Sequence, residues 1–259
     1  RMGGVTRMIE DGDLDGRAVA LTWGPTVDVV YANAVRPILD EADINVVSEI
    51  EIGDFGEDQV AARAAWDRAV ERARTDGADL ILHLSNITPP LDALGRAEAT
   101  DITLALTNGQ AADGTTVVGQ STAPDEIREN AFAVTTYKPP AQGALDDPGV
   151  TQCLDEYEAQ GGDMDALDLE NDDFANGIVN WCRVFRLTTM ILEAAGPDLT
   201  PESFIAGGES LGDIDLPAMP SASLGPNKHS AGSQLIRYEY DTEAGHFVPV
   251  GEPFLAAFE

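Results

Sequence analysis

The sequence predicts an α/β fold in which a parallel β-sheet is flanked by helices. Apolar segments of roughly four to seven residues recur through the first half of the chain, and amphipathic segments of roughly ten to eighteen residues separate them. This alternation is typical of right-handed βαβ units. The predicted strands are apolar throughout rather than alternating, as expected where helices cover both faces of a sheet.

The first half of the chain contains most of the predicted strands. The first strand follows residues 11–16, a turn-forming segment rich in aspartate and glycine. The longest helix of this half has apolar residues on one face and ends at Gly77. The predicted strands are 18–23, 44–50, 80–84, 102–106, 117–118 and 131–136. The predicted helices are 27–41, 58–75 and 91–99.

The pattern changes after Lys138-Pro139-Pro140, where a stretch rich in proline and glycine is typical of a connection. A mostly helical region follows, and its predicted helices are 150–160, 174–195 and 198–208. We place Thr200 as the N-cap of the last of these helices and Pro201 as its first residue. A terminal β-hairpin is predicted from segments 235–241 and 246–250.

The charge of the chain excludes several partners. Its 259 residues have a net charge of −31 at pH 7, and Lys138 and Lys228 are the two lysines. Such a chain repels nucleic-acid phosphate and anionic lipid surfaces. No apolar run is long enough to span a membrane, so membrane insertion is not expected. Both a salt-rich habitat and an ordinary acidic secreted surface agree with this charge.

The two cysteines, Cys153 and Cys182, are predicted to form a disulfide. Neither lies in a C-x-x-C motif and only three histidines accompany them, so a zinc site is not expected. They fall on two successive predicted helices, and an even pair favours a disulfide over two buried thiols. A disulfide would indicate an oxidising compartment.

No motif predicts a catalytic, phosphate-binding or cofactor site. The chain has no P-loop, no G-x-G-x-x-G after the first strand and no G-x-S-x-G elbow. His83 lies in an apolar segment and is predicted to be a core residue, while His229 is predicted to stabilise its loop. The protein is therefore predicted not to be an enzyme and to use no cofactor.

Two acidic segments resemble calcium loops only in part. Residues 11–16 begin like such a loop, but its twelfth position is Thr22 rather than glutamate, so a plain turn is favoured. Residues 163–173 contain six acidic residues, which favours a solvated loop. Calcium binding by residues 163–173 stays open as the alternative.

Ligands of open parallel sheets bind at the carboxyl ends of the strands. The residues at these ends are uncharged, and the candidate ligand-binding residues are Trp23, Gly24, Ser85, Asn86, Asn108 and Gln110. They provide hydrogen-bond donors, acceptors and one aromatic wall, but no general base, no activated nucleophile and no metal ligand. This set favours holding a small polar solute over transforming it. Ordinary turn residues at strand ends are the alternative.

The order of these motifs resembles the type I periplasmic binding proteins, the branched-chain amino-acid-binding class. Residues 16–21 and 43–47 resemble the opening of the second lobe of that family, and Gly77-Ala78-Asp79 resembles the entry to its third strand. The C-terminal loop and hairpin of the family are matched by 225–230, 238–240 and 245–250.

The resemblance implies a two-lobed fold whose first lobe is incomplete. Residues 1–16 would be the end of a first-lobe segment and the crossover, and residues 17–138 would be the second βα lobe. Residues 139–259 would return to the first lobe and end in the hairpin. The initial part of the first lobe would be absent, so the chain is expected to begin inside a longer precursor.

The resemblance also implies a function. The chain would be the solute-binding component of an ABC importer, located in the periplasm or attached to the cell surface. It would capture a small polar solute, such as an amino acid or an amide, and dock on a membrane permease. The family's ligand-facing acid falls near residues 108–110, where no acid stands, which favours a neutral solute. A ligand-sensing receptor ectodomain and an α/β enzyme are the alternatives.

Overall fold

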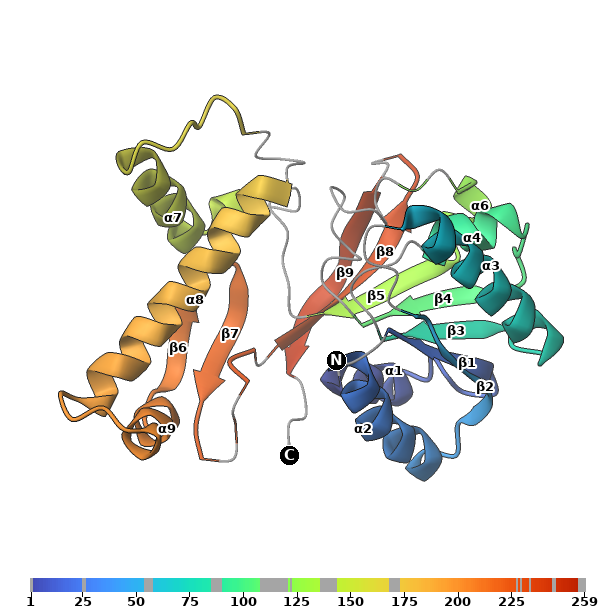
Figure 1. Cartoon of the computed structure of the whole chain (residues 1–259), viewed down its shortest axis with the longest axis horizontal. Helices are drawn as coiled ribbons and strands as arrows, with labels where there is room; N and C mark the ends of the chain where they lie inside the picture. The colour runs from blue at the N-terminus through green and yellow to red at the C-terminus, as the bar shows by residue number, and fades with distance from the viewer. Residues whose placement is uncertain are drawn as a thin grey trace. The chain divides into compact units, whose positions relative to one another are not determined.

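The computed structural model of the chain is shown in Figure 1. It describes residues 2–24, 27–53, 58–84, 90–107, 121, 123–135, 144–167, 173–226, 228, 230–232, 234–243 and 246–255. The chain folds into two compact units. Unit 1 comprises Arg1–Thr135 and Arg237–Gly251, and unit 2 comprises Thr136–Ile236 and Glu252–Glu259.

Unit 1 is built on a seven-stranded sheet with the strand order β2-β1-β3-β4-β5-β8-β9 (Figure 1). The strands are β1 (Ala18–Trp23), β2 (Asn45–Glu51), β3 (Leu80–His83), β4 (Thr103–Leu106), β5 (Ala131–Thr135), β8 (Gln234–Asp241) and β9 (His246–Leu255). Strands β1 to β5 pair in parallel. The predicted α/β fold with a mostly parallel sheet is confirmed.

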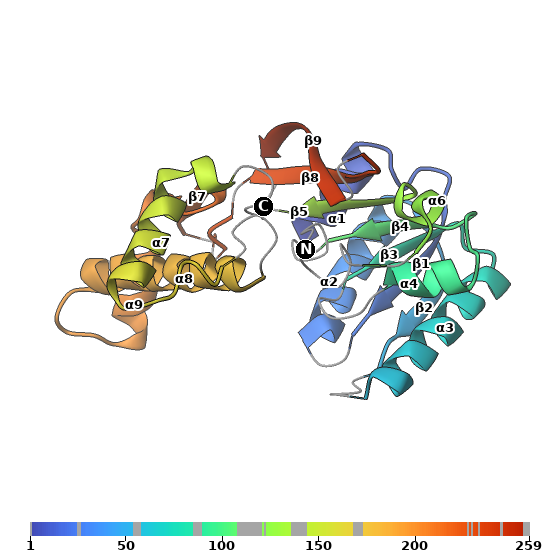
Figure 2. The same ribbon diagram turned by 90° about the horizontal axis from the view of Figure 1, so that it is seen from above.

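Helices cover both faces of this sheet, with α1 and α2 on one face and α3 and α4 on the other (Figure 2). The helices are α1 (Met2–Glu10), α2 (Val27–Glu41), α3 (Gln59–Thr75), α4 (Pro90–Arg96) and α6 (Asp125–Arg128). Every residue of the inner strands β3 and β5 is buried, whereas the edge strand β2 exposes several of its residues. The continuous apolar runs of the sequence therefore follow from two covered faces.

The strands and helices predicted for the first half are present within three residues of their expected bounds. Strand β1 and helix α2 have the predicted bounds, and Asp58 caps α3 by accepting a hydrogen bond from Ala61 N. Helix α6 was not predicted. The predicted strand 117–118 and the connection around Pro139 lie outside the described residues.

Helix α1 and most of the terminal hairpin lie in unit 1. Helix α1 packs so closely on β5 that a Cβ added to Gly4 would lie 3.0 Å from Val134 O. Arg237 on β8 forms a 2.7 Å ion pair with Asp13, and its guanidinium lies 4.2 Å from the ring centroid of Phe132. The predicted division into residues 1–16, 17–138 and 139–259 stays a prediction.

Unit 2 combines helices with a small antiparallel sheet. Its elements are η2 (Ala144–Asp146), α7 (Pro148–Ala159), α8 (Asp173–Ala195), α9 (Pro201–Glu209), β6 (Gly212–Leu216) and β7 (Met219–Leu224). The predicted cap of α9 is confirmed, since Thr200 Oγ1 accepts from Ser203 N and Pro201 opens the helix. Strands β6 and β7 were not predicted. No helix in the described residues is long and apolar enough to cross a membrane.

Candidate functional site

The parallel strands bring their carboxyl ends to one edge of the sheet. In the register of the sheet, Thr22 of β1 lies opposite His83 of β3, and His83 lies opposite Leu106 of β4. The next residues along these strands therefore form a row at the edge: Trp23, Leu84 and Thr107. Backbone pairing continues into this row, because Leu84 N donates to Thr22 O at 2.9 Å. Thr107 Oγ1 donates to His83 O at 3.2 Å.

Trp23 and Gly24 end β1 at this edge, as the sequence predicted for the end of the first strand. Trp23 is half-buried and Gly24 is buried. The indole Nε1 of Trp23 is buried and has no hydrogen-bond partner within the described part of the chain. A buried N–H without an acceptor is costly in free energy, so an incoming acceptor would be favoured there.

The other four candidate ligand-binding residues lie outside the described residues: Ser85, Asn86, Asn108 and Gln110. They come directly after the described ends of β3 and β4 in the sequence, at Leu84 and Thr107. Their part in a ligand site stays a prediction.

His83 lies behind this edge as a core residue, as predicted. Its side chain is 2% exposed, and its Nδ1 lies 3.0 Å from Thr22 Oγ1. The fully buried Trp66 of α3 contacts the imidazole edge-on, with the ring centroids 5.0 Å apart. These contacts fix the His83 side chain in the core at the end of β3, one residue before Leu84 of the row at the carboxyl edge.

Charged residues are found at the opposite, amino-terminal edge of the same strands. Arg17 Nε donates to Asp79 Oδ1 at 2.7 Å, and the same guanidinium donates to Thr103 Oγ1 at 2.8 Å. Thr103 Oγ1 in turn donates to Asn130 Oδ1 at 3.0 Å. Arg17 thus links Asp79, which precedes β3, to Thr103 at the start of β4. Trp23, Leu84 and Thr107 are uncharged, whereas Glu51 of the edge strand β2 lies opposite Trp23 in the register.

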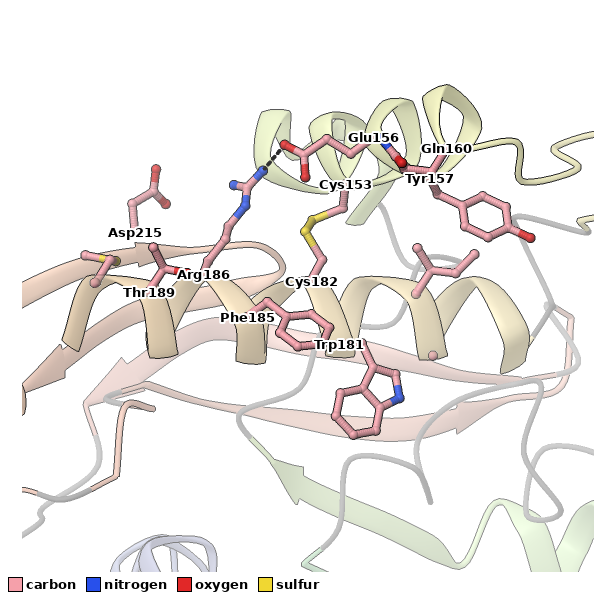
Figure 3. A pocket seen from close by; sticks show the side chains of 13 residues that line it. Cys153, Glu156, Tyr157, Gln160, Trp181, Cys182, Phe185, Arg186, Thr189 and Asp215 are labelled. Atoms are coloured by element: carbon pink, nitrogen blue, oxygen red, sulfur yellow. Dashed lines mark ion pairs between the residues drawn. A yellow bond between two sulfur atoms is a disulfide. The ribbon is translucent and has the colours of Figure 1, made fainter. Parts of the chain in front are cut away.

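A second concave surface lies in unit 2 between α7 and α8 (Figure 3). It has a volume of about 950 Å³. The predicted disulfide between Cys153 and Cys182 is present in its lining, with the Cα atoms 5.9 Å apart. The surrounding side chains are largely apolar and include Tyr157, Ile178, Trp181, Phe185 and Met190. We call this surface the α7–α8 groove.

One ion pair lies in the α7–α8 groove. Arg186 of α8 lies 3.8 Å from Glu156 of α7, and Figure 3 shows the two side chains pointing toward one another. Sequence reasoning missed the groove, although Trp181 and Phe185 are four residues apart in a predicted helix. Their spacing was the available signal, but spacing alone does not show whether such a pair is buried.

The acidic turn after α1 binds arginines rather than forming a cluster. Asp11 accepts from Arg7, and Asp13 accepts from Arg237 at 2.7 Å. In the part of the chain that the structure describes, no group of three or more histidine, cysteine, aspartate or glutamate residues could hold a metal ion. Residues 168–172 of the second acidic segment lie outside that part.

The fold is that of the type I periplasmic binding proteins, so the resemblance seen in the sequence is confirmed at the level of the fold. A solute-binding protein of an ABC transporter from R. palustris, in complex with 4-hydroxybenzoate, matches with a TM-score of 0.64 and 16% identity. That match covers 98% of this chain and 65% of the other. Neither a family model nor a curated protein sequence matches the chain.

Two further solved structures show the same relationship. The leucine-, isoleucine-, valine-, threonine- and alanine-binding protein from Brucella ovis has a TM-score of 0.63 and 15% identity, with coverage of 98% and 61%. The fatty acid ABC transporter substrate-binding protein from Thermomonospora curvata has a TM-score of 0.64 and 18% identity, with coverage of 98% and 63%. The chain thus spans less than two thirds of the length of these solute-binding proteins.

Proposed function

We propose that this chain is part of an extracytoplasmic solute-binding component of an ABC importer. The observation that supports this proposal is the fold, which the chain shares over nearly all its length with ABC substrate-binding proteins. Those neighbours are described as binding 4-hydroxybenzoate, the amino acids leucine, isoleucine, valine, threonine and alanine, or a fatty acid, so one fold serves several kinds of solute. The membrane partner would be the permease of the transporter.

The proposed solute site is the carboxyl edge of β1, β3 and β4. Its residues would be Trp23 and Gly24, with Ser85, Asn86, Asn108 and Gln110 from the segments that follow the strands. The uncharged row at this edge and the unpaired indole N–H of Trp23 favour a small polar solute that offers a carbonyl or hydroxyl acceptor. An amide or a polyol fits this description.

The proposed location is the periplasm or the outer cell surface. The disulfide between Cys153 and Cys182 supports it, because disulfides persist in oxidising compartments and are rare in the cytosol. The net charge of −31 agrees with a solvent-exposed acidic surface that binds neither nucleic acid nor anionic lipid.

Thermal unfolding in the presence of millimolar amino acids, amides, polyols and aromatic acids tests the proposal. A solute at 100 times its Kd stabilises the native state by about 2.7 kcal/mol, which raises Tm by several degrees. Trp23→Ala should abolish that shift. Phe204→Ala is the matched control, since Phe204 is an aromatic residue of α9 in unit 2 with 38% exposure.

Two outcomes would contradict the proposal at different levels. A solute that stabilises the wild type and Trp23→Ala equally would exclude the carboxyl edge as the site while leaving solute capture intact. A full-length gene product that no solute in the panel stabilises would argue against capture of these solute classes.

A further inference from the structure

The carboxyl edge of the sheet includes a carboxylate that the predicted ligand-binding residues do not contain. Glu51 is the last residue of β2, and in the register of the sheet it lies opposite Trp23, the last residue of β1. The pairing continues beyond them, because Ile52 N donates to Trp23 O at 2.7 Å. Residues directly opposite one another in neighbouring strands project from the same face of a sheet. The Glu51 carboxylate and the Trp23 indole therefore belong to neighbouring side chains on one face.

The ion pair of Glu49 shows which face of the sheet this is. Glu49 lies two residues before Glu51 on β2, and its carboxylate pairs with the Arg36 guanidinium on α2. Side chains two residues apart in a strand project from the same face. Glu51 and Trp23 therefore project from the side of the sheet that α2 covers, at the carboxyl ends of their strands (Figure 2).

Glu51 has no cationic partner, in contrast to Glu49. Its side chain is exposed, and within the described part of the chain it forms no ion pair and no hydrogen bond. The absence of an acid near residues 108–110 favours a neutral solute, but Glu51 provides an acid at the same edge from a different strand. A solute with a positive charge is therefore compatible with this edge.

Trp23 provides an aromatic ring beside this carboxylate. Its side chain is half-buried, and the face of an indole attracts organic cations more strongly than other aromatic rings do. The buried N–H lies in the plane of the ring and lacks an acceptor within the described residues, so one solute can bind both parts of the side chain. Leu84, next to Trp23 in the row, is buried and has no acceptor in its side chain. This apolar neighbour favours a nitrogen that carries methyl groups over one whose N–H groups need acceptors.

The charge of the whole chain agrees with a cationic solute, since a net charge of −31 attracts cations and repels anions. We propose that the solute is a quaternary ammonium compound with a hydroxyl or carbonyl oxygen. The oxygen accepts from Trp23 Nε1, and the positive nitrogen lies between the Trp23 ring and the Glu51 carboxylate. This inference rests on the proposed function, because it names the solute class of the site proposed at the carboxyl edge.

Calorimetric titration of the full-length gene product with choline tests this proposal. Choline has a quaternary nitrogen and one hydroxyl, and its neutral isostere is the alcohol in which a carbon atom replaces that nitrogen. Choline should bind about tenfold more tightly than the isostere. Glu51→Gln should weaken choline binding about tenfold and leave binding of the isostere unchanged. Glu49→Gln is the matched control, because it removes the same charge from the same strand and should leave the Kd for choline unaltered.

The unfolding midpoint without solute separates binding from folding. Glu51→Gln removes no contact within the described residues, so its midpoint should equal that of the wild type. Equal affinities for choline and its isostere would overturn the proposal, as would equal losses in Glu51→Gln and Glu49→Gln. A protein that does not bind choline would overturn it too. The proposed function is decided separately, because a neutral solute whose stabilising effect is lost in Trp23→Ala would retain the carboxyl edge as the solute site.

Discussion

Cys153 of α7 and Cys182 of α8 are joined by a disulfide that spans 29 residues of sequence. Cys153 is 2% exposed, and the bond links the two helices that line the α7–α8 groove. The connection between the helices includes acidic residues such as Asp163 and Asp165, which contribute little to an apolar core. The disulfide therefore restrains a pair of helices that are joined by a polar segment.

Removing this disulfide should destabilise unit 2. A bond that closes a loop of this length stabilises the native state by about 3.6 kcal/mol, chiefly by restricting the unfolded chain. Cys153→Ala with Cys182→Ala should lower the free energy of unfolding of unit 2 by that amount, as measured by urea unfolding followed through tryptophan fluorescence. The double variant must not respond to dithiothreitol. A wild type whose transition is the same with and without the reductant would contradict the prediction.

Asp147 should be a second stabilising residue of unit 2. Its Oδ1 accepts from Gly149 N at 2.7 Å and caps α7, while its Oδ2 accepts from Ala218 N at 2.9 Å in the β6–β7 turn. Asp147→Ala leaves both donors unpaired and should cost about 2 kcal/mol in urea unfolding. Asp146→Ala is the matched control, because Asp146 is the exposed preceding residue. Equal effects of the two substitutions would exclude this role.

The indole N–H of Trp23 should contribute to solute binding, if the proposed site is correct. Trp23→Phe keeps an aromatic wall but removes the buried N–H donor. The loss of one hydrogen bond should weaken binding about tenfold, which corresponds to about 1.4 kcal/mol. Calorimetric titration with the solute found by thermal unfolding measures this change. An unaltered Kd in Trp23→Phe would mean that the ring, and not the N–H, contacts the solute.

Tyr240 should make unit 1 sensitive to alkaline pH. Burial raises the pKa of Tyr240 above its usual value of 10.0, and the nearby Arg128 guanidinium partly opposes the shift. The unfolded chain therefore loses this proton at a lower pH than the folded chain, so stability falls as pH rises above about 10. Tyr240→Phe should reduce the fall, measured by urea unfolding between about pH 9 and 11. Parallel pH profiles for wild type and variant would show that other groups cause it.

The first half of the chain was predictable because its signals are local. Strand β1 and helix α2 have the predicted bounds, since an apolar run between turn-forming residues and a helical spacing of apolar residues suffice to define them. Strands β6 and β7 were missed because their sequence is rich in aspartate, proline and serine. Ile214 and Leu216 alternate with exposed residues, and their packing under α8 outweighs the weak local preference.

The candidate site was predictable only in part. The rule that ligands bind at strand ends selected Trp23 and Gly24, and the register of β1, β3 and β4 aligns Trp23 with Leu84 and Thr107 at one edge, where ligand binding stays a prediction. The α7–α8 groove could not be predicted, because helical spacing alone does not show whether a pair such as Trp181 and Phe185 is buried or exposed. Its exposure depends on which other segments pack against α8.

By itself the sequence determined the fold class, the pairing of Cys153 with Cys182 and the burial of His83. Apolar periodicity indicates the local secondary structure, and residue type indicates which side chains are buried or paired. Only the tertiary structure decided that the terminal strands extend the parallel sheet. Arg237 and Asp13 form an ion pair although 224 positions separate them. Contacts over such distances are selected by the packing of whole elements, and a local pattern contains no information about them.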